Sequence, residues 1–216
     1  MGLLELFLVD RYFIWFCVIV IGVMEVYVGF NRLIKGLKEC SLCFRSRKAD
    51  YSLVLDYIPV GVRVMFVVYE PVSGFFYDLS SGCVFRDKFL DLLFEAGLIG
   101  GRSLEAFAKR RFYLSYVVKC RGGSVSYCKR FLREEIRVLS PRIICTLGES
   151  ALRVFLRREE TGLREYVGSF VPSRELRSDM TLGTPVFACY YPGRGPVSDS
   201  IKVEHFRRLK FYLSKY

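Results

Sequence analysis

The stretch from Tyr113 to Ala151, YLSYVVKCRGGSVSYCKRFLREEIRVLSPRIICTLGESA, decides the fold. It begins with a β-branched and aromatic run that predicts a buried strand. Cys120 and Cys128 lie on either side of a Gly-Gly turn, and residues 128–139 carry apolar side chains at helical spacing. A second apolar run, 142–147, predicts a strand that leads through a glycine into another helix. The stretch therefore predicts strand, cysteine turn, amphipathic helix, strand and helix.

The same alternation of strands and helices continues on both sides of this stretch. The runs that predict strands are 62–69, 112–118, 142–147 and 185–190. The segments that predict helices are 86–97, 103–110, 128–139, 148–158 and 201–216, whereas 159–183 is polar and irregular. Strands that alternate with helices indicate a parallel sheet covered on both faces. We therefore expect an α/β fold: a three-layer α/β/α sandwich with a central, mostly parallel four-stranded sheet.

Ligands of such folds bind at the carboxyl ends of the strands. In this chain those ends are the loops 69–71, 119–121, 147–149 and 191–193. The sequence predicts that these loops share one face of the molecule.

The charge balance favours a polyanionic partner. The chain has 33 Lys and Arg against 22 Asp and Glu, a net charge of +11. Between Arg102 and Arg142 there are eleven basic and three acidic residues, so this stretch alone carries 11 − 3 = +8. Nucleic acid is the first candidate and an anionic membrane surface the second, while a general basic bias is the plain alternative. With 14 Tyr and 19 Phe, the composition excludes a disordered chain.

The N-terminal residues have two interpretations. Residues 12–24 carry no charge, and the apolar character continues to residue 30, which is marginal for a membrane anchor of about 20 residues. Alternatively, residues 1–23 are an apolar extension in front of a start at Met24. We expect residues 24–216 to form the main domain, as a monomer in the cytoplasm, with tethering to a membrane through residues 12–30 as the lesser alternative.

The cysteines divide into two groups. Cys17, Cys145 and Cys189 lie in apolar runs and are interpreted as packed hydrophobic residues, and Cys83 as a spare loop thiol. The four with metal-ligand spacing are Cys40, Cys43, Cys120 and Cys128. Four thiolates can hold zinc or an iron–sulfur cluster, and buried free thiols are the alternative. The nearby basic residues would stabilise thiolates, in a reducing intracellular setting.

A series of short motifs runs through residues 26–216. They are Val64-Met65-Phe66-Val67 before Pro71, Gly82-Cys83-Val84-Phe85, Glu95-Ala96-Gly97-Leu98, Val118-Lys119-Cys120-Arg121, Cys128-Lys129-Arg130-Phe131-Leu132, Leu139-Ser140-Pro141-Arg142-Ile143-Ile144 and Leu147-Gly148-Glu149-Ser150-Ala151. In order and spacing this series resembles the iron–sulfur (family 4) uracil-DNA glycosylases. The resemblance implies a 4Fe–4S cluster on the four cysteines, with zinc as the lesser alternative, and DNA, single- or double-stranded, as the partner. Only seven residues separate Cys120 from Cys128, fewer than the family pattern has.

The positions that match the family's catalytic residues carry tyrosine. Tyr69 stands where the family has an acidic residue, with Glu70 next to it; Tyr116 replaces an Asn and Tyr191 a His. Tyrosine, with a pKa near 10, is a poor base at neutral pH. In an active enzyme, Glu70 or Tyr69 would position water, and Tyr191 and Tyr116 would bond the departing base.

The resemblance also assigns residues to the base pocket and to DNA. Phe85 matches the Phe that stacks on the extruded base, and Pro71 and Tyr116 would line the same pocket. The expected DNA contacts are Lys119, Arg121, Gly193 and Arg194. His205, the single histidine, is expected to be a solvated residue of the last helix rather than a catalyst.

Two functions follow as hypotheses. The first is a DNA-binding, glycosylase-like protein with a cluster that hydrolyses the N-glycosidic bond of uracil or another damaged base. The alternative is a degenerate relative that has lost catalysis and acts as a nucleic-acid-binding or interaction module, which the three tyrosines favour.

Overall fold

The computed structural model describes residues 24–43, 47–48, 50–71, 74–80, 82–158 and 162–215. At its centre lies a four-stranded sheet in the order β3-β2-β5-β6. The strands are β2 (Val64–Val68), β3 (Phe112–Tyr116), β5 (Ile143–Leu147) and β6 (Val186–Cys189). All three pairings are parallel, and every residue of the four strands is buried. Burial on both faces explains the uninterrupted apolar runs in the sequence.

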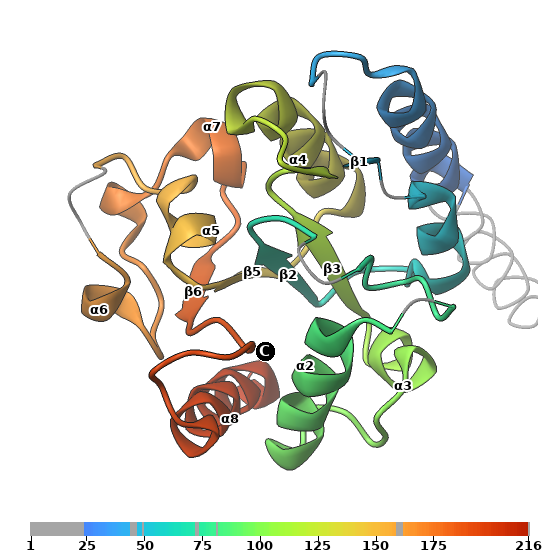
Figure 1. Cartoon of the computed structure of the whole chain (residues 1–216). Coiled ribbons are helices and arrows are strands. Elements are labelled where there is room, and N and C mark those ends of the chain that lie inside the picture. The colour runs from blue at the N-terminus through green and yellow to red at the C-terminus, as the bar shows by residue number, and fades with distance from the viewer. Residues whose placement is uncertain are drawn as a thin grey trace, which may run out of the picture.

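Helices cover both faces of the sheet, with α2, α3 and α8 below it and α4, α5 and α7 above it in Figure 1. The helices are α2 (Val84–Glu95), α3 (Leu104–Lys109), α4 (Val125–Leu139), α5 (Glu149–Arg153), α6 (Leu163–Tyr166), α7 (Ser178–Thr181) and α8 (Asp199–Lys215). The 3-10 helices are η1 (Tyr51–Tyr57) and η2 (Ser173–Glu175). The predicted three-layer α/β/α architecture is confirmed.

Two details of the helix prediction were wrong. The helix after Gly148 ends at Arg153 rather than near residue 158, and the segment 162–183, expected to be irregular, contains α6, η2 and α7. These elements are only three to five residues long. Elements this short depend on packing against the rest of the fold, which local sequence does not reveal.

One face of the sheet carries an aromatic core around Phe66. Its ring lies 5.1 Å from Phe89 of α2, 5.9 Å from Phe107 of α3 and 6.4 Å from Phe206 of α8, measured between ring centroids. Edge-to-face and tilted pairs of this kind add about 0.5–1.5 kcal/mol each beyond the area that they bury. This cluster fixes the helices of that face on the sheet.

On the other face, α4 packs against a helix that covers residues 24–39. Glycines allow a close approach: a Cβ on Gly29 would lie 3.0 Å from Val138 of α4, and one on Gly36 would lie 3.5 Å from Phe131. Phe30 of the same helix meets Tyr113 of β3 edge-on at 5.8 Å. This helix is therefore held beside α4.

A second, two-stranded sheet joins β1 (Arg47–Lys48) to β4 (Cys120–Arg121) in antiparallel register, with Lys48 opposite Cys120. It brings the chain that follows Cys43 next to Cys120. Among the described residues, no helix is both long and apolar enough to cross a membrane. The predicted N-terminal extension or anchor, residues 1–23, lies outside the described residues.

Candidate functional site

The loops at the carboxyl ends of the strands meet around a cavity of about 180 Å³. Its lining comes from the end of β2, from the β5–α5 turn and from the loop after β6: Val68, Tyr69, Glu70, Leu147, Gly148, Glu149, Ser150 and Tyr191. The parallel sheet brings these segments together, as the alternation of elements predicted. The cavity therefore marks the candidate site.

Tyr191 stacks on Phe85. The two rings are nearly parallel, at 18°, with centroids 5.6 Å apart. Glycines make room for the tyrosine: a Cβ on Gly193 would lie 2.2 Å from its ring, and one on Gly148, at φ +94°, would lie 3.2 Å from its Cβ. Tyr191 is still 37% exposed. The ring of Tyr191 therefore covers Phe85. By its resemblance to the family pattern, Phe85 is the residue expected to stack on an extruded base.

Tyr116 is buried and already has a partner. Its hydroxyl accepts a hydrogen bond of 3.0 Å from the amide of Phe76, and burial raises its pKa well above the usual value. The hydroxyl of Tyr77 accepts a hydrogen bond of 2.8 Å from the amide of Leu114 and donates one of 3.1 Å to its carbonyl. The two tyrosines thereby fasten the segment 74–80 to β3.

The carboxylates of the site lie at its rim. Glu70 accepts a hydrogen bond of 3.0 Å from the amide of Gly122, which joins the end of β2 to the turn after β4. Glu149 pairs with Arg153 one helical turn later, at 2.5 Å. Glu149 is not among the residues predicted for the site, although its place in the strand-end loop 147–149 is a usable signal. Tyr69 is half-buried and Pro71 is buried.

Tyr191 also lines a larger cavity of about 870 Å³. It is lined by Val84, Phe85, Lys88, Tyr191, Gly193, Arg194, Gly195, Val197, Ser198, Asp199 and Lys202. Lys202 of α8 holds the loop in place, because its buried ammonium donates to the carbonyl of Gly193 at 2.8 Å and lies 3.3 Å from Asp199. Arg194 is exposed at the rim of this cavity.

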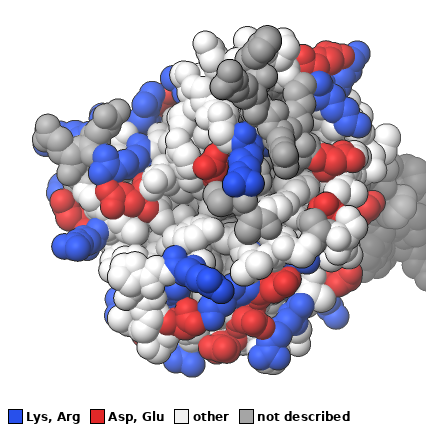
Figure 2. Space-filling model, viewed as in Figure 1, with Lys and Arg blue, Asp and Glu red and all other residues white. Residues whose placement is uncertain are grey.

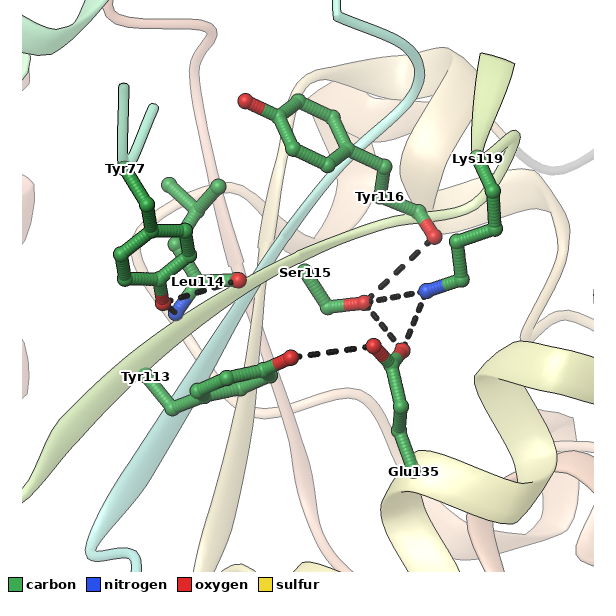
Figure 3. A network of polar contacts seen from close by, with 7 residues as sticks. All are labelled: Tyr77, Tyr113, Leu114, Ser115, Tyr116, Lys119 and Glu135. Carbon is green, nitrogen blue, oxygen red and sulfur yellow. Dashed lines mark hydrogen bonds and ion pairs between the residues drawn. The ribbon is translucent and has the colours of Figure 1, made fainter. Parts of the chain in front are cut away.

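Lys119 is not available to DNA, contrary to our expectation. Its side chain is fully buried, and its ammonium forms an ion pair with Glu135 of α4 and donates to Ser115 at 2.7 Å (Figure 3). Tyr113 donates to the other oxygen of Glu135 at 3.0 Å. Burial lowers the pKa of Lys119, and Glu135 opposes that shift. By contrast, Arg121, the neighbouring candidate in β4, is exposed.

The candidate metal ligands come from three parts of the fold. Cys40 and Cys43 follow the helix 24–39, Cys120 lies in β4 and Cys128 in α4. Burial raises the pKa of Cys128, and the charges of Cys120 and Cys43 raise it further. Three of the four thiols thus lie within electrostatic reach of one another. No group of three or more His, Cys, Asp or Glu within the described part of the chain is arranged to hold a metal ion.

Tyr51 adds an observation at the same place. Its hydroxyl is buried and has no hydrogen-bond partner among the described residues. Burial raises its pKa, and the charges of Glu135, Cys120 and Cys128 contribute. A buried hydroxyl normally has a partner. An acceptor beside these thiols would provide one.

The histidine and the remaining cysteines of the described part of the chain are buried. Cys145 and Cys189 lie in the core with their sulfurs 3.7 Å apart, as predicted for packed residues, whereas Cys17 lies outside the described residues. Cys83 is buried, not a spare loop thiol. His205 is also buried and stacks on Tyr190 at 5.3 Å, so the prediction of a solvated side chain was wrong. His205 lies on the inward face of α8. The charged residues next to it in the sequence had suggested an exposed position.

Comparison with known families identifies the class of this fold. The model of the uracil DNA glycosylase superfamily matches residues 55–202, well over half of the chain. The chain belongs to that superfamily. No curated protein matches it significantly.

Proposed function

We propose that this chain binds DNA through the loops at the carboxyl ends of its sheet, and that its own Tyr191 closes the base pocket, so that it does not excise uracil efficiently. The observation that carries the proposal is the stack of Tyr191 on Phe85. Excision needs the target base to enter a pocket and to be held there by stacking. In this chain, a tyrosine ring occupies that face of Phe85.

The polar groups of the site support the same conclusion. The hydroxyl of Tyr116 accepts a hydrogen bond from the amide of Phe76, and burial raises its pKa further above that of an ordinary tyrosine, which makes it a still poorer base at neutral pH. Glu70 is held by the amide of Gly122. Glycosidic hydrolysis requires a free proton acceptor beside an open pocket for the nucleobase. Neither Tyr116 nor Glu70 is placed in this way.

Contacts with DNA would come from single exposed cations. Arg194 projects from a loop that Lys202 holds, and Arg121 is exposed in β4. Figure 2 shows basic and acidic side chains mixed around the rim of the viewed face, without one basic surface. We therefore expect moderate, salt-dependent binding of single- or double-stranded DNA.

Hydrolysis is the second candidate function, and one observation favours it. Tyr69, Glu70 and Glu149 line the same cavity as Tyr191. If Tyr191 swings away from Phe85, Glu70 or Tyr69 would position the attacking water, and Tyr191 and Tyr116 would bond the departing base. The substrate would be uracil or another damaged base in DNA.

We further propose that Cys40, Cys43, Cys120 and Cys128 hold a 4Fe–4S cluster, with zinc as the lesser alternative. Support comes from the proximity of three of the thiols, from the unpaired Tyr51 hydroxyl and from the neighbouring Lys119 ammonium. When bound, the group would supply a covalent link between the helix 24–39, β4 and α4. This would make it a structural support of the DNA-binding loops rather than a participant in base excision.

Incubation of the purified protein with uracil-containing single and double strands tests the function. We expect DNA binding without abasic product, and weaker binding by Arg194→Gln than by the control Arg174→Gln, an exposed arginine of η2. Formation of abasic product by the wild-type protein would establish hydrolysis instead. Absence of DNA binding at low salt would refute both candidates.

A spectrum tests the cluster. We expect a brown protein with absorption at about 400 nm, as thiolate-bound clusters show, and loss of that band in Cys120→Ala. Cys145→Ala, which changes a buried core cysteine, is the matched control. A colourless protein that contains zinc would refute the cluster and support zinc as the bound metal.

A further inference from the structure

The cavity of about 870 Å³ has an excess of positive charge in its lining. It lies between α2 and the start of α8, two helices that pack side by side (Figure 1). Among the described residues, the charged groups that line it are Lys88, Arg194, Lys202 and Asp199. Three positive charges against one negative give a net charge of 3 − 1 = +2. The cavity therefore favours an anionic ligand.

The one carboxylate of this lining is shared by both lysines. Asp199 forms an ion pair with Lys88 and lies 3.3 Å from the ammonium of Lys202. A single carboxylate balances one of these two charges, so one positive charge of the three groups remains. Arg194 adds another, since in the described part of the chain its guanidinium forms no ion pair with a carboxylate.

The loop that carries Arg194 is fixed by contacts on both sides. The buried ammonium of Lys202 donates to the carbonyl of Gly193 at 2.8 Å and to that of Pro192 at 3.4 Å. Tyr191 packs on Gly193, where a Cβ would lie 2.2 Å from the tyrosine ring. A group on a backbone that is already ordered loses less conformational freedom when it binds a ligand. Arg194 is therefore well placed to hold a phosphate.

An apolar wall completes the cavity. Val84, the first residue of α2, lines it and is 64% exposed. Val197 lines it from the loop before α8 and is half-buried. Side chains of this kind can pack against the apolar faces of a nucleobase. The volume also lies within the range of ligand sites, about 300–1,000 Å³.

This cavity is open while the base pocket is closed. It is present in the same structure in which Tyr191 stacks on Phe85 at 5.6 Å. A ligand can therefore bind here without displacing Tyr191 from Phe85.

We propose that this cavity holds one unstacked nucleotide of single-stranded DNA, with its phosphate on Arg194 and Lys88 and its base against Val84 and Val197. The inference rests on the DNA binding proposed above and names the single strand as the preferred form. A duplex keeps its bases stacked and paired, and extruding one of them costs free energy. The bases of a single strand are already free to enter such a site.

The first test compares three fluorescent ligands by anisotropy. They are an oligothymidine, the same strand paired with oligoadenosine, and a strand of equal length that consists of abasic units. We expect the oligothymidine to bind about tenfold more tightly than either of the others, because the duplex must extrude a base and the abasic strand has none. Equal affinity for the single strand and the duplex would overturn the inference. Equal affinity for the abasic strand would also overturn it, since the site would then recognise phosphate alone.

A substitution in the apolar wall tests the base contact. Val84→Ser should weaken binding of the oligothymidine about threefold, because apolar contact with the base is lost, and should leave binding of the abasic strand unchanged. The control is Val60→Ser, which changes a valine that is 56% exposed in the loop before β2. Equal effects of the two variants would contradict a base in this cavity.

A substitution of the shared carboxylate tests the phosphate contact. Asp199→Asn removes the negative charge of the lining and should tighten binding of the oligothymidine and of the abasic strand about threefold. The control, Asp179→Asn in α7, removes a surface carboxylate that pairs with Arg177. Unchanged affinity in Asp199→Asn would contradict a phosphate in this cavity. Thermal unfolding of each variant checks that it folds.

Failure of this inference can be distinguished from failure of the proposed function. Equal binding of single strand and duplex, without a response to Val84→Ser, would overturn the inference alone, because DNA binding itself would remain. Absence of DNA binding at low salt would overturn both.

Discussion

The ammonium of Lys119 and the carboxylate of Glu135 form an ion pair that is sealed from solvent, with side chains 1% and 0% exposed. Ser115 and Tyr113 of β3 complete the hydrogen bonds of the pair. The network joins β3 to α4, next to Cys120 and Cys128. It holds the scaffold of the proposed metal site, whether or not a metal is bound.

Breaking this pair from one side should be costly. We expect Glu135→Gln to lower the free energy of unfolding by about 3–5 kcal/mol, because it leaves the Lys119 charge buried and unpaired. Urea unfolding measures the difference. The neighbouring Glu134→Gln is the control: Glu134 pairs with Arg137 at the surface, where such pairs contribute about 0–1 kcal/mol. Equal effects of the two variants would contradict a special role for the buried pair.

Tyr51 should respond differently from the other buried tyrosines. Without metal, Tyr51→Phe removes an unpaired buried hydroxyl, and we expect the free energy of unfolding to rise by about 1 kcal/mol. Tyr77→Phe is the matched control and should destabilise, since that hydroxyl bonds Leu114 twice. If a cluster is present, Tyr51→Phe should move its midpoint potential to more negative values, because a donor to the sulfurs is lost. Destabilisation of the metal-free protein by Tyr51→Phe would show that the hydroxyl has a partner.

Removal of the tyrosine that covers Phe85 should open the base pocket. We expect Tyr191→Ala to bind uracil-containing single-stranded DNA at least about fivefold more tightly, since stacking of a base is worth about 1–3 kcal/mol. Anisotropy measures the affinity, and an abasic-site assay shows whether excision appears. Tyr27→Ala changes another exposed tyrosine, on the helix 24–39, and should have no effect. Weaker binding by Tyr191→Ala would mean that Tyr191 itself contacts DNA.

His205 should make the fold sensitive to mild acid. Burial lowers its pKa below 6.5, Arg208 lowers it further and Glu204 opposes them. The folded pKa is therefore lower than the unfolded one, and stability is lost as the pH falls below 6.5. Unfolding by urea between pH 7 and about pH 5, above the range in which carboxylates titrate, measures this loss. In His205→Gln the slope over this interval should disappear; an unchanged slope would assign it to other groups.

The central sheet could be predicted because it imposes a strong local pattern. Strands covered on both faces need continuous apolar runs, and those runs are present at 64–68, 112–116, 143–147 and 186–189. The convergence of the strand-end loops then follows from the parallel arrangement. Short elements such as α6 and α7 carry no such pattern, because their stability comes from contacts with distant residues.

The opening stretch, Tyr113 to Ala151, determined by itself the strand, the amphipathic helix and the next strand. The tertiary structure decided what its charged and aromatic side chains do. Lys119 turns inward because α4 brings Glu135 to it, and Phe85 is covered because the loop after β6 places Tyr191 on its ring. Apolar periodicity is a property of neighbouring residues and can be seen in sequence. The partner of an individual side chain depends on segments that meet only when the chain has folded.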